Sequence, residues 1–107
     1  MDRITRILEM LKQEEHDSFL QHALALEYIK IGNDHEAKKL FDNILNREPT
    51  YLGSYYHLGK LLERIGDTEK AMRVYERGME VARAANDSHT YNELQGAYED
   101  AEDELED

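Results

Sequence analysis

The chain has 107 residues, of which 40% are hydrophobic and 35% are charged, and this allows one domain with a modest core. It contains no cysteine, which excludes a disulfide framework and thiolate chemistry. No apolar run approaches the length of about 18 residues that a membrane-spanning helix needs, and the N-terminal segment lacks the apolar core of a secretory signal. We therefore expect a cytoplasmic protein that has no membrane partner.

The net charge of −11 is concentrated at the C-terminal end of the chain. Residues 1–83 carry 13 Lys and Arg against 15 Asp and Glu, whereas residues 84–107 carry nine acidic residues and no Lys or Arg. The sequence contains no clustered basic stripe of the kind that binds phosphate groups. Nucleic acid is therefore not expected among the partners.

The first predicted element is an amphipathic helix over residues 2–15. Its apolar residues are spaced so that they share one helical face, and they are Ile4, Ile7, Leu8 and Leu11. We expect this face to pack against the segment that follows.

The next segment, residues 18–49, is predicted to form a pair of helices. Asp17 or Ser18 is expected to start the first helix, and Ser18-x-x-Gln21 has the spacing of a capping box. Gly32 is expected to end that helix in a left-handed conformation, and Asn33 or Asp34 to cap the second helix.

Residues 52–85 repeat this arrangement, with Gly66 as the break and Asp67 as the cap of the second helix. Residues 88–103 are predicted to form one terminal helix whose apolar residues face back toward the preceding pair. The last segment, 104–107, is expected to be an acidic tail.

The two predicted helix pairs are copies of one pattern. Leu24–Phe41 aligns with Leu58–Tyr75 over 18 positions without a gap, at an offset of 34 residues. A fixed period of this length, built from two short helices per unit, predicts a helical solenoid. In this register the helix at 2–15 corresponds to the second helix of a repeat, and we expect it to cap the first full unit.

The residues that define the period also resemble a known family. The second copy reads Tyr55-x2-Leu58-Gly59-x2-Leu62 and then Ala71-x3-Tyr75, and the first reads Gln21-x2-Leu24-Ala25-x2-Tyr28, then Ala37-x3-Phe41 and Pro49. This pattern resembles the tetratricopeptide repeat, whose signature is W-x2-L-G-x2-Y, then A-x3-F, then P. The resemblance implies a small stand-alone protein with an all-α fold, a right-handed helical solenoid of antiparallel helix pairs with about six helices.

The geometry of this repeat places the first helix of each pair on the concave side, where ligands usually lie. Aromatic, imidazole and amide groups beside exposed apolar groups suit an extended or helical peptide. The residues expected to form this peptide- or protein-binding groove are Phe19, His22, Leu26, Ile29, Tyr56, His57, Lys60, Glu63, His89 and Asn92. The sequence leaves open a second interpretation, in which Leu26 and Ile29 only pack against neighbouring helices.

Nothing in the sequence favours catalysis, a cofactor or a metal. There is no nucleophile with an adjacent base and no glycine-rich phosphate loop, and no histidine lies in a metal-binding motif. His22, His57 and His89 come from three successive first helices, and one hypothesis is that they converge as a pH-sensitive contact or a metal site. The subtype of the family that clamps a terminal carboxylate is not expected, because His22 and Leu26 stand where that subtype has Lys and Asn.

Two functions from different classes follow from these observations. The first is an adaptor or scaffold, monomeric and non-catalytic, that binds a protein or peptide segment in the groove. The alternative is a structural module that self-associates as a weak homodimer through its terminal helices, using Ile4, Leu8 or Tyr98. The nine acidic residues near the C-terminus repel one another, so we expect self-association at the N-terminal helix instead.

Overall fold

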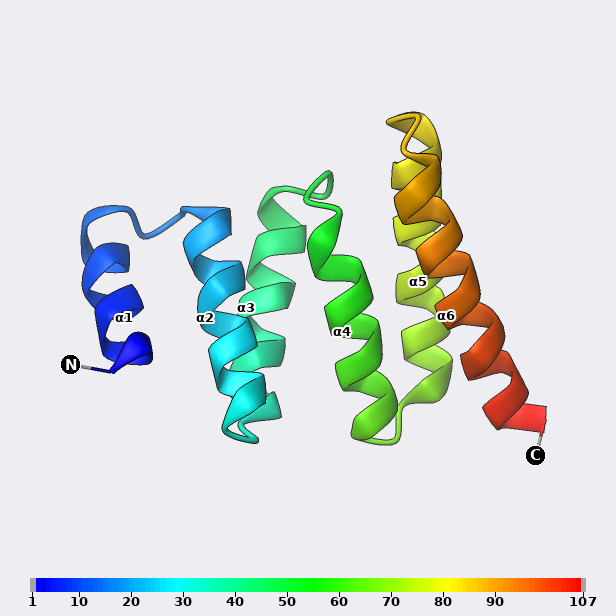
Figure 1. Cartoon of the computed structure of the whole chain (residues 1–107), viewed down its shortest axis with the longest axis horizontal. Coiled ribbons are helices and arrows are strands. Elements are labelled where there is room, and N and C mark those ends of the chain that lie inside the picture. The colour runs from blue at the N-terminus through cyan, green and yellow to red at the C-terminus, as the bar shows by residue number, and fades with distance from the viewer. Residues whose placement is uncertain (1, 107) are drawn as a thin grey trace. The chain divides into compact units, whose positions relative to one another are not determined.

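The computed structural model describes residues 2–106, and in this range the secondary structure consists of six α-helices (Figure 1). The chain divides into two compact units between Tyr51 and Leu52. The first unit contains α1 (Arg3–Gln13), α2 (Ser18–Lys30) and α3 (Asp34–Arg47). The second unit contains α4 (Gly53–Arg64), α5 (Thr68–Ala84) and α6 (Ser88–Glu106). The prediction of an all-α fold is confirmed.

In the first unit, α2 and α3 form the main pair and α1 packs against α2 (Figure 1). The core of the pair consists of residues that are at most 3% exposed, and these are Leu24, Ala25, Ala37, Phe41 and Ile44. From α1 only Ile7 is buried. Ile4 and Leu11 of α1 are half-buried, so the first helix contributes less to the core than α2 and α3 do.

The structure decides between Asp17 and Ser18, the two residues expected at the start of α2. The N-cap is Asp17, whose side chain accepts a hydrogen bond of 3.0 Å from the backbone N–H of Leu20. The Ser18 hydroxyl instead donates to Glu48 at 3.2 Å and accepts from Arg47 at 3.1 Å, at the far end of α3. The expectation that Asp17 starts the helix is confirmed, whereas the Ser18–Gln21 capping box does not form, because the Asp17 carboxylate caps the helix and leaves the Ser18 hydroxyl for a tertiary contact.

The turns inside the two helix pairs follow the predicted 34-residue register. Gly32 and Gly66 both have positive φ, 80° and 90°, a region in which a Cβ is strained. Asn33 and Asp67 then cap the following helices through their side chains. Asn86, with φ of 58°, takes the left-handed position between α5 and α6, where the earlier turns have glycine.

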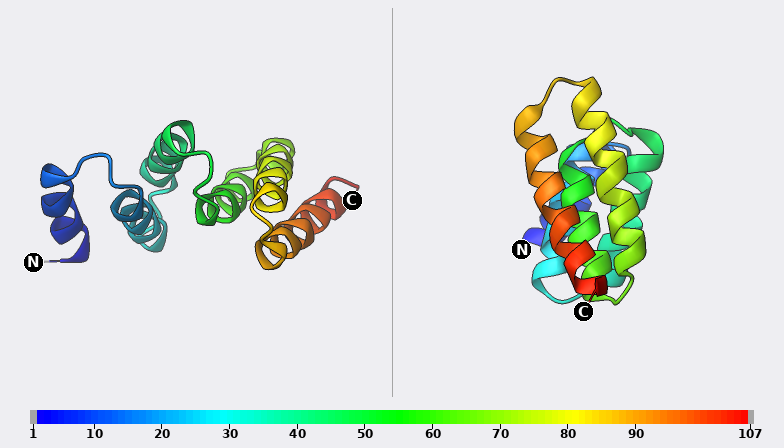
Figure 2. Two further views of the ribbon diagram at one scale, coloured as in Figure 1. Left: turned by 90° about the horizontal axis from the view of Figure 1, so that it is seen from above. Right: turned by 90° about the vertical axis from the view of Figure 1, so that its right-hand side faces the viewer.

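In the second unit, α5 packs against both α4 and α6, and the views of Figure 2 show α6 running along α5. Gly59 of α4 lies directly against the Tyr75 ring of α5, and a Cβ added there would be 2.0 Å from Cε1 of Tyr75. Gly78 makes a similar approach to Tyr55 and Leu94. These glycines let large, fully buried side chains lie directly against a neighbouring helix.

The last helix is longer than predicted, because α6 continues to Glu106 rather than ending near residue 103. Leu94, Ala97 and Ala101 lie on one face of α6 and are buried, so the helix is packed along most of its length. No Gly or Pro follows Ala101 to end the helix, and the acidic residues of the expected tail are exposed on its surface. Asp107, the last residue of that tail, lies outside the described residues.

Within residues 2–106, none of the helices combines the length and the apolar character that crossing a membrane requires.

Candidate functional site

Three of the predicted binding residues line one hollow in the first unit. The hollow has a volume of about 260 Å³ and is lined by residues of α1 and α2. Its apolar lining comes from one face of α2, namely Phe19, Ala23 and Leu26, and His22 lies on the same face. The helical spacing of three and four residues places these side chains together. The groove face predicted for α2 therefore contains a concave apolar site.

Phe19 is the most exposed apolar residue of this site, with 70% of its surface accessible. It also lines a second hollow, of about 400 Å³, together with Met10 of α1 and Leu20. An aromatic ring between two hollows offers a large apolar contact area that the unit itself does not cover. Burying a Phe side chain contributes about 1.5–3 kcal/mol.

His22 is held in place by two aromatic rings of the same unit. Its ring lies edge-on to Phe41, with centroids 5.7 Å apart, and tilted against Tyr51 at 5.5 Å. Burial raises the pKa of the Tyr51 hydroxyl above its ordinary value of 10. The imidazole thus forms part of a fixed wall of the hollow.

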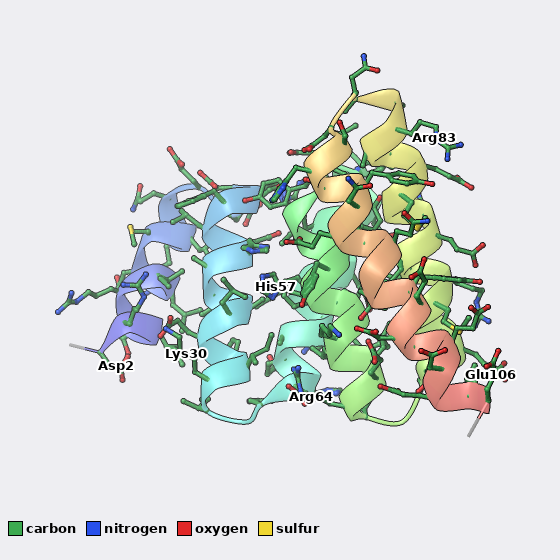
Figure 3. The ribbon with its side chains drawn as sticks, turned by 45° about the vertical axis from the view of Figure 1, so that its right-hand side comes forward. Asp2, Lys30, His57, Arg64, Arg83 and Glu106 are labelled. Carbon is green, nitrogen blue, oxygen red and sulfur yellow. The ribbon has the colours of Figure 1, made fainter. Side chains whose placement is uncertain are left out.

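The rim of the hollow is charged. Nε of Arg3 lies 3.2 Å and Nζ of Lys30 lies 2.9 Å from the same oxygen, Oε2 of Glu27. The hydrogen bond from Lys30 is the main cause that lowers the pKa of Glu27, and the charge of Arg3 adds to it. Figure 3 shows Lys30 and Asp2, the residue before Arg3, at the adjacent ends of α2 and α1.

Sequence reasoning missed these rim residues. Glu27 and Lys30 are one helical turn apart, and that spacing could have suggested an ion pair. Nothing in the sequence indicates that Arg3 joins them, because the contact depends on how α1 packs against α2. Of the other candidates on α2, Leu26 lines the hollow while half-buried, and Ile29 is half-buried outside the lining.

In the second unit, the predicted residues of α4 contact one another along the helix. The rings of Tyr56 and His57 meet edge-on with centroids 5.6 Å apart, and Nζ of Lys60 lies 5.7 Å from the centre of the Tyr56 ring. Burial lowers the pKa of His57 below its ordinary value of 6.5, and the charge of Glu93 on α6 partly opposes this. His57 is therefore mainly neutral at physiological pH.

Glu63 is engaged inside the second unit, with only 10% of its side chain exposed. It accepts a short hydrogen bond from the Tyr75 hydroxyl, and it lies 3.8 Å from Nζ of Lys60. The Glu104 carboxyl also hydrogen-bonds to Glu63, and this contact raises the pKa of Glu104. The Glu63 carboxylate thus joins all three helices of the unit.

The remaining candidates, His89 and Asn92, are exposed on α6. The ten predicted residues are divided between the two units, so the groove that they form together stays a prediction, as does the convergence of His22, His57 and His89. Over residues 2–106, no group of three or more His, Asp or Glu side chains has an arrangement that could hold a metal ion.

Antiparallel helix pairs at a 34-residue period, each with a left-handed glycine at its turn and a buried alanine in its second helix, define a helical-repeat protein. The family model of the tetratricopeptide repeat matches residues 52–84. A tetratricopeptide repeat domain protein from Salinibacter ruber is 43% identical to this chain, with 80% of this chain and 87% of that one covered and a TM-score of 0.78. The chain belongs to the tetratricopeptide repeat family.

Two further solved structures resemble this chain over most of its length. A protein from Bordetella parapertussis is 26% identical, covers 97% of this chain and 90% of its own, and has a TM-score of 0.84. The TPR2B domain of yeast Sti1, in its complex with pHsp70, is 15% identical, covers 94% and 81%, and has a TM-score of 0.87. At that identity the likeness shows the fold alone. The comparison with curated proteins gave no match.

Proposed function

We propose that this protein is a non-catalytic adaptor or scaffold that binds a peptide or protein segment, and that the hollow beside Phe19 is its principal contact. The family is a protein-interaction fold, and a structural relative is described in complex with pHsp70. The observation that carries the proposal is the 70% exposed ring of Phe19 at the edge of a concave apolar site. The absence of cysteine supports a cytoplasmic location.

Aromatic residues in a concave, largely apolar site are the usual centres of protein interfaces. A few such anchors carry most of the binding free energy, while the surrounding contacts mainly exclude water. Phe19 provides the anchor, and the wall formed by His22 is already ordered by Phe41 and Tyr51, so little side-chain entropy is lost on binding. The site is thus preorganised for a short segment of a partner.

Selection from a random peptide library displayed on phage, with the full chain as bait, tests this function. Enriched peptides would be synthesised with a fluorescent label, and their affinity measured by fluorescence anisotropy. Phe19→Ala should weaken binding at least about fivefold, because an aromatic anchor contributes more than 1 kcal/mol.

The matched control is Ile65→Ala, which removes an apolar side chain that is 53% exposed in the second unit. It should leave the affinity unchanged, and circular dichroism should show the same helicity for both variants. If no peptide is enriched, or if Phe19→Ala binds as tightly as the wild type, the proposed function is wrong.

Self-association is a second candidate function, favoured by the exposed face of α1. Leu8 and Met10 are 42% and 48% exposed, and the amphipathic helix to which they belong buries only Ile7. Sedimentation equilibrium should then show a dimer at high concentration, and Leu8→Glu should abolish it. A wild-type chain that sediments as a monomer at every concentration would exclude this candidate.

A further inference from the structure

We propose that the hollow of the first unit selects acidic segments, in which a large apolar side chain enters beside Phe19 and an adjacent Asp or Glu meets Arg3 and Lys30. This inference rests on the proposed function and names the chemical class of its partner. It requires an internal acidic residue and no free terminal carboxylate.

The rim of the hollow has a net positive charge. Two cations share a single carboxylate oxygen, so the group of Arg3, Glu27 and Lys30 keeps one net positive charge. The two basic side chains are 70% and 68% exposed, whereas Glu27 is only 14% exposed. An approaching ligand therefore encounters the cations rather than the carboxylate.

Arg3 and Lys30 have more N–H donors than Glu27 can accept. A guanidinium has five N–H donors and an ammonium has three, and all of these are more than one carboxylate oxygen can accept. Arg3 and Lys30 thus keep donors for an additional acceptor, and a carboxylate would form charge-assisted hydrogen bonds with both. A basic partner would face two exposed cations at the same place.

The positive charge lies beside the apolar lining of the hollow. Both cations line the same hollow as Phe19, Ala23 and Leu26. Screening reduces interactions between exposed charges beyond about 8 Å at physiological ionic strength. In the partner, the acidic residue must therefore lie close in sequence to the apolar residue that enters the hollow. Because of the same screening, the net charge of −11 on the whole chain has little effect on an acidic residue bound at the rim.

The peptides enriched from the library provide the first readout. We expect most of them to contain Leu, Ile, Met or an aromatic residue within two positions of Asp or Glu, and to carry a net negative charge. Peptides synthesised with an amidated C-terminus should keep their affinity. Replacing the acidic residues by Gln and Asn should weaken binding, and the difference should shrink in 0.5 M salt.

Affinities of variants that remove either positive or negative charge from the rim provide the second readout. The double variant Arg3→Ala/Lys30→Ala should bind an enriched acidic peptide about fivefold more weakly, as expected for the loss of two exposed charge contacts. Glu27→Gln removes the competing carboxylate and should bind the same peptide more tightly, by roughly twofold. A charge-matched control, Lys12→Ala/Lys39→Ala, removes two exposed lysines that pair with Glu9 and Glu36 outside the hollow, and should change nothing.

The outcomes separate this inference from the proposed function. If enriched peptides are neutral or basic, or if the rim variants and the control bind equally, the charge preference is wrong while the adaptor function stands. If no peptide is enriched, both are wrong. A synthetic peptide of residues 98–107 serves as a further probe. If this peptide binds and the chain also forms a dimer in sedimentation, the occupant of the hollow is a second copy of this chain. The proposal of a separate partner is then overturned.

Discussion

Replacing Gly59 tests whether the second unit requires a residue without a Cβ where α4 meets the Tyr75 ring of α5. A Cβ at this position would lie 2.0 Å from Cε1 and 2.5 Å from Cζ of Tyr75. Carbon atoms in ordinary contact are about 3.5–4.0 Å apart, so the ring would have to move by well over 1 Å. Tyr75 is completely buried and its hydroxyl is bound to Glu63, so the ring has no space into which it can shift.

The substitution Gly59→Ala has two opposing effects. Alanine favours a helix over glycine by roughly 1 kcal/mol, whereas overpacking a core costs about 1–3 kcal/mol. Because the contact is far inside the van der Waals distance, we expect the upper part of that range and a net destabilisation of about 1–2 kcal/mol. Urea unfolding followed by circular dichroism measures this as a lower midpoint.

The matched control is Gly96→Ala on α6, where an added Cβ would have no neighbouring atom within 4 Å. It should stabilise the protein by roughly 0.5–1 kcal/mol. If both variants raise the urea midpoint, the close-approach argument is wrong. The triple variant Gly59→Ala/Glu63→Ile/Tyr75→Phe should recover part of the loss, because it copies the residues at the equivalent positions of the first unit, Ala25, Ile29 and Phe41.

Two further predictions concern polar groups of the second unit. Tyr75→Phe removes the donor to Glu63 and should destabilise the protein by about 1–2 kcal/mol, seen as a lower urea midpoint; an unchanged midpoint would mean that this hydrogen bond contributes nothing. Because the pKa of His57 is lowered in the folded state, the unfolded chain takes up the proton more readily, and the stability contributed by neutral His57 is lost as pH falls below about 6.5. The wild type should therefore lose more stability than His57→Gln between pH 7 and pH 5, and equal losses would refute the burial argument.

The fold was largely predictable because the information that specifies it is local and repeated. Gly32 and Gly66 mark the turns, Asn33 and Asp67 mark the starts of the next helices, and the 34-residue offset places them in equivalent positions. The exception is the end of α6. Its length was underestimated because the acidic composition of the last residues was interpreted as a tail, whereas Ala101 anchors that end of the helix.

The candidate site was only partly predictable. Phe19, His22 and Leu26 were expected from their positions on the first helix of a repeat, and they do line one hollow. Arg3 was not expected, because its contact with Glu27 joins residues of two helices whose packing is not specified by spacing along the chain.

The sequence by itself determined the helices, their turns and the repeat, because each depends on neighbours within one or two helical turns or on the fixed period. Only the tertiary structure decided which side chains remain available to a partner. It exposed Phe19 beside an apolar hollow, placed two cations on one carboxylate at the rim, and engaged Glu63 with Tyr75. Such contacts form only where separate helices pack together. Their energies depend on how deeply the side chains are buried, which local sequence spacing does not specify.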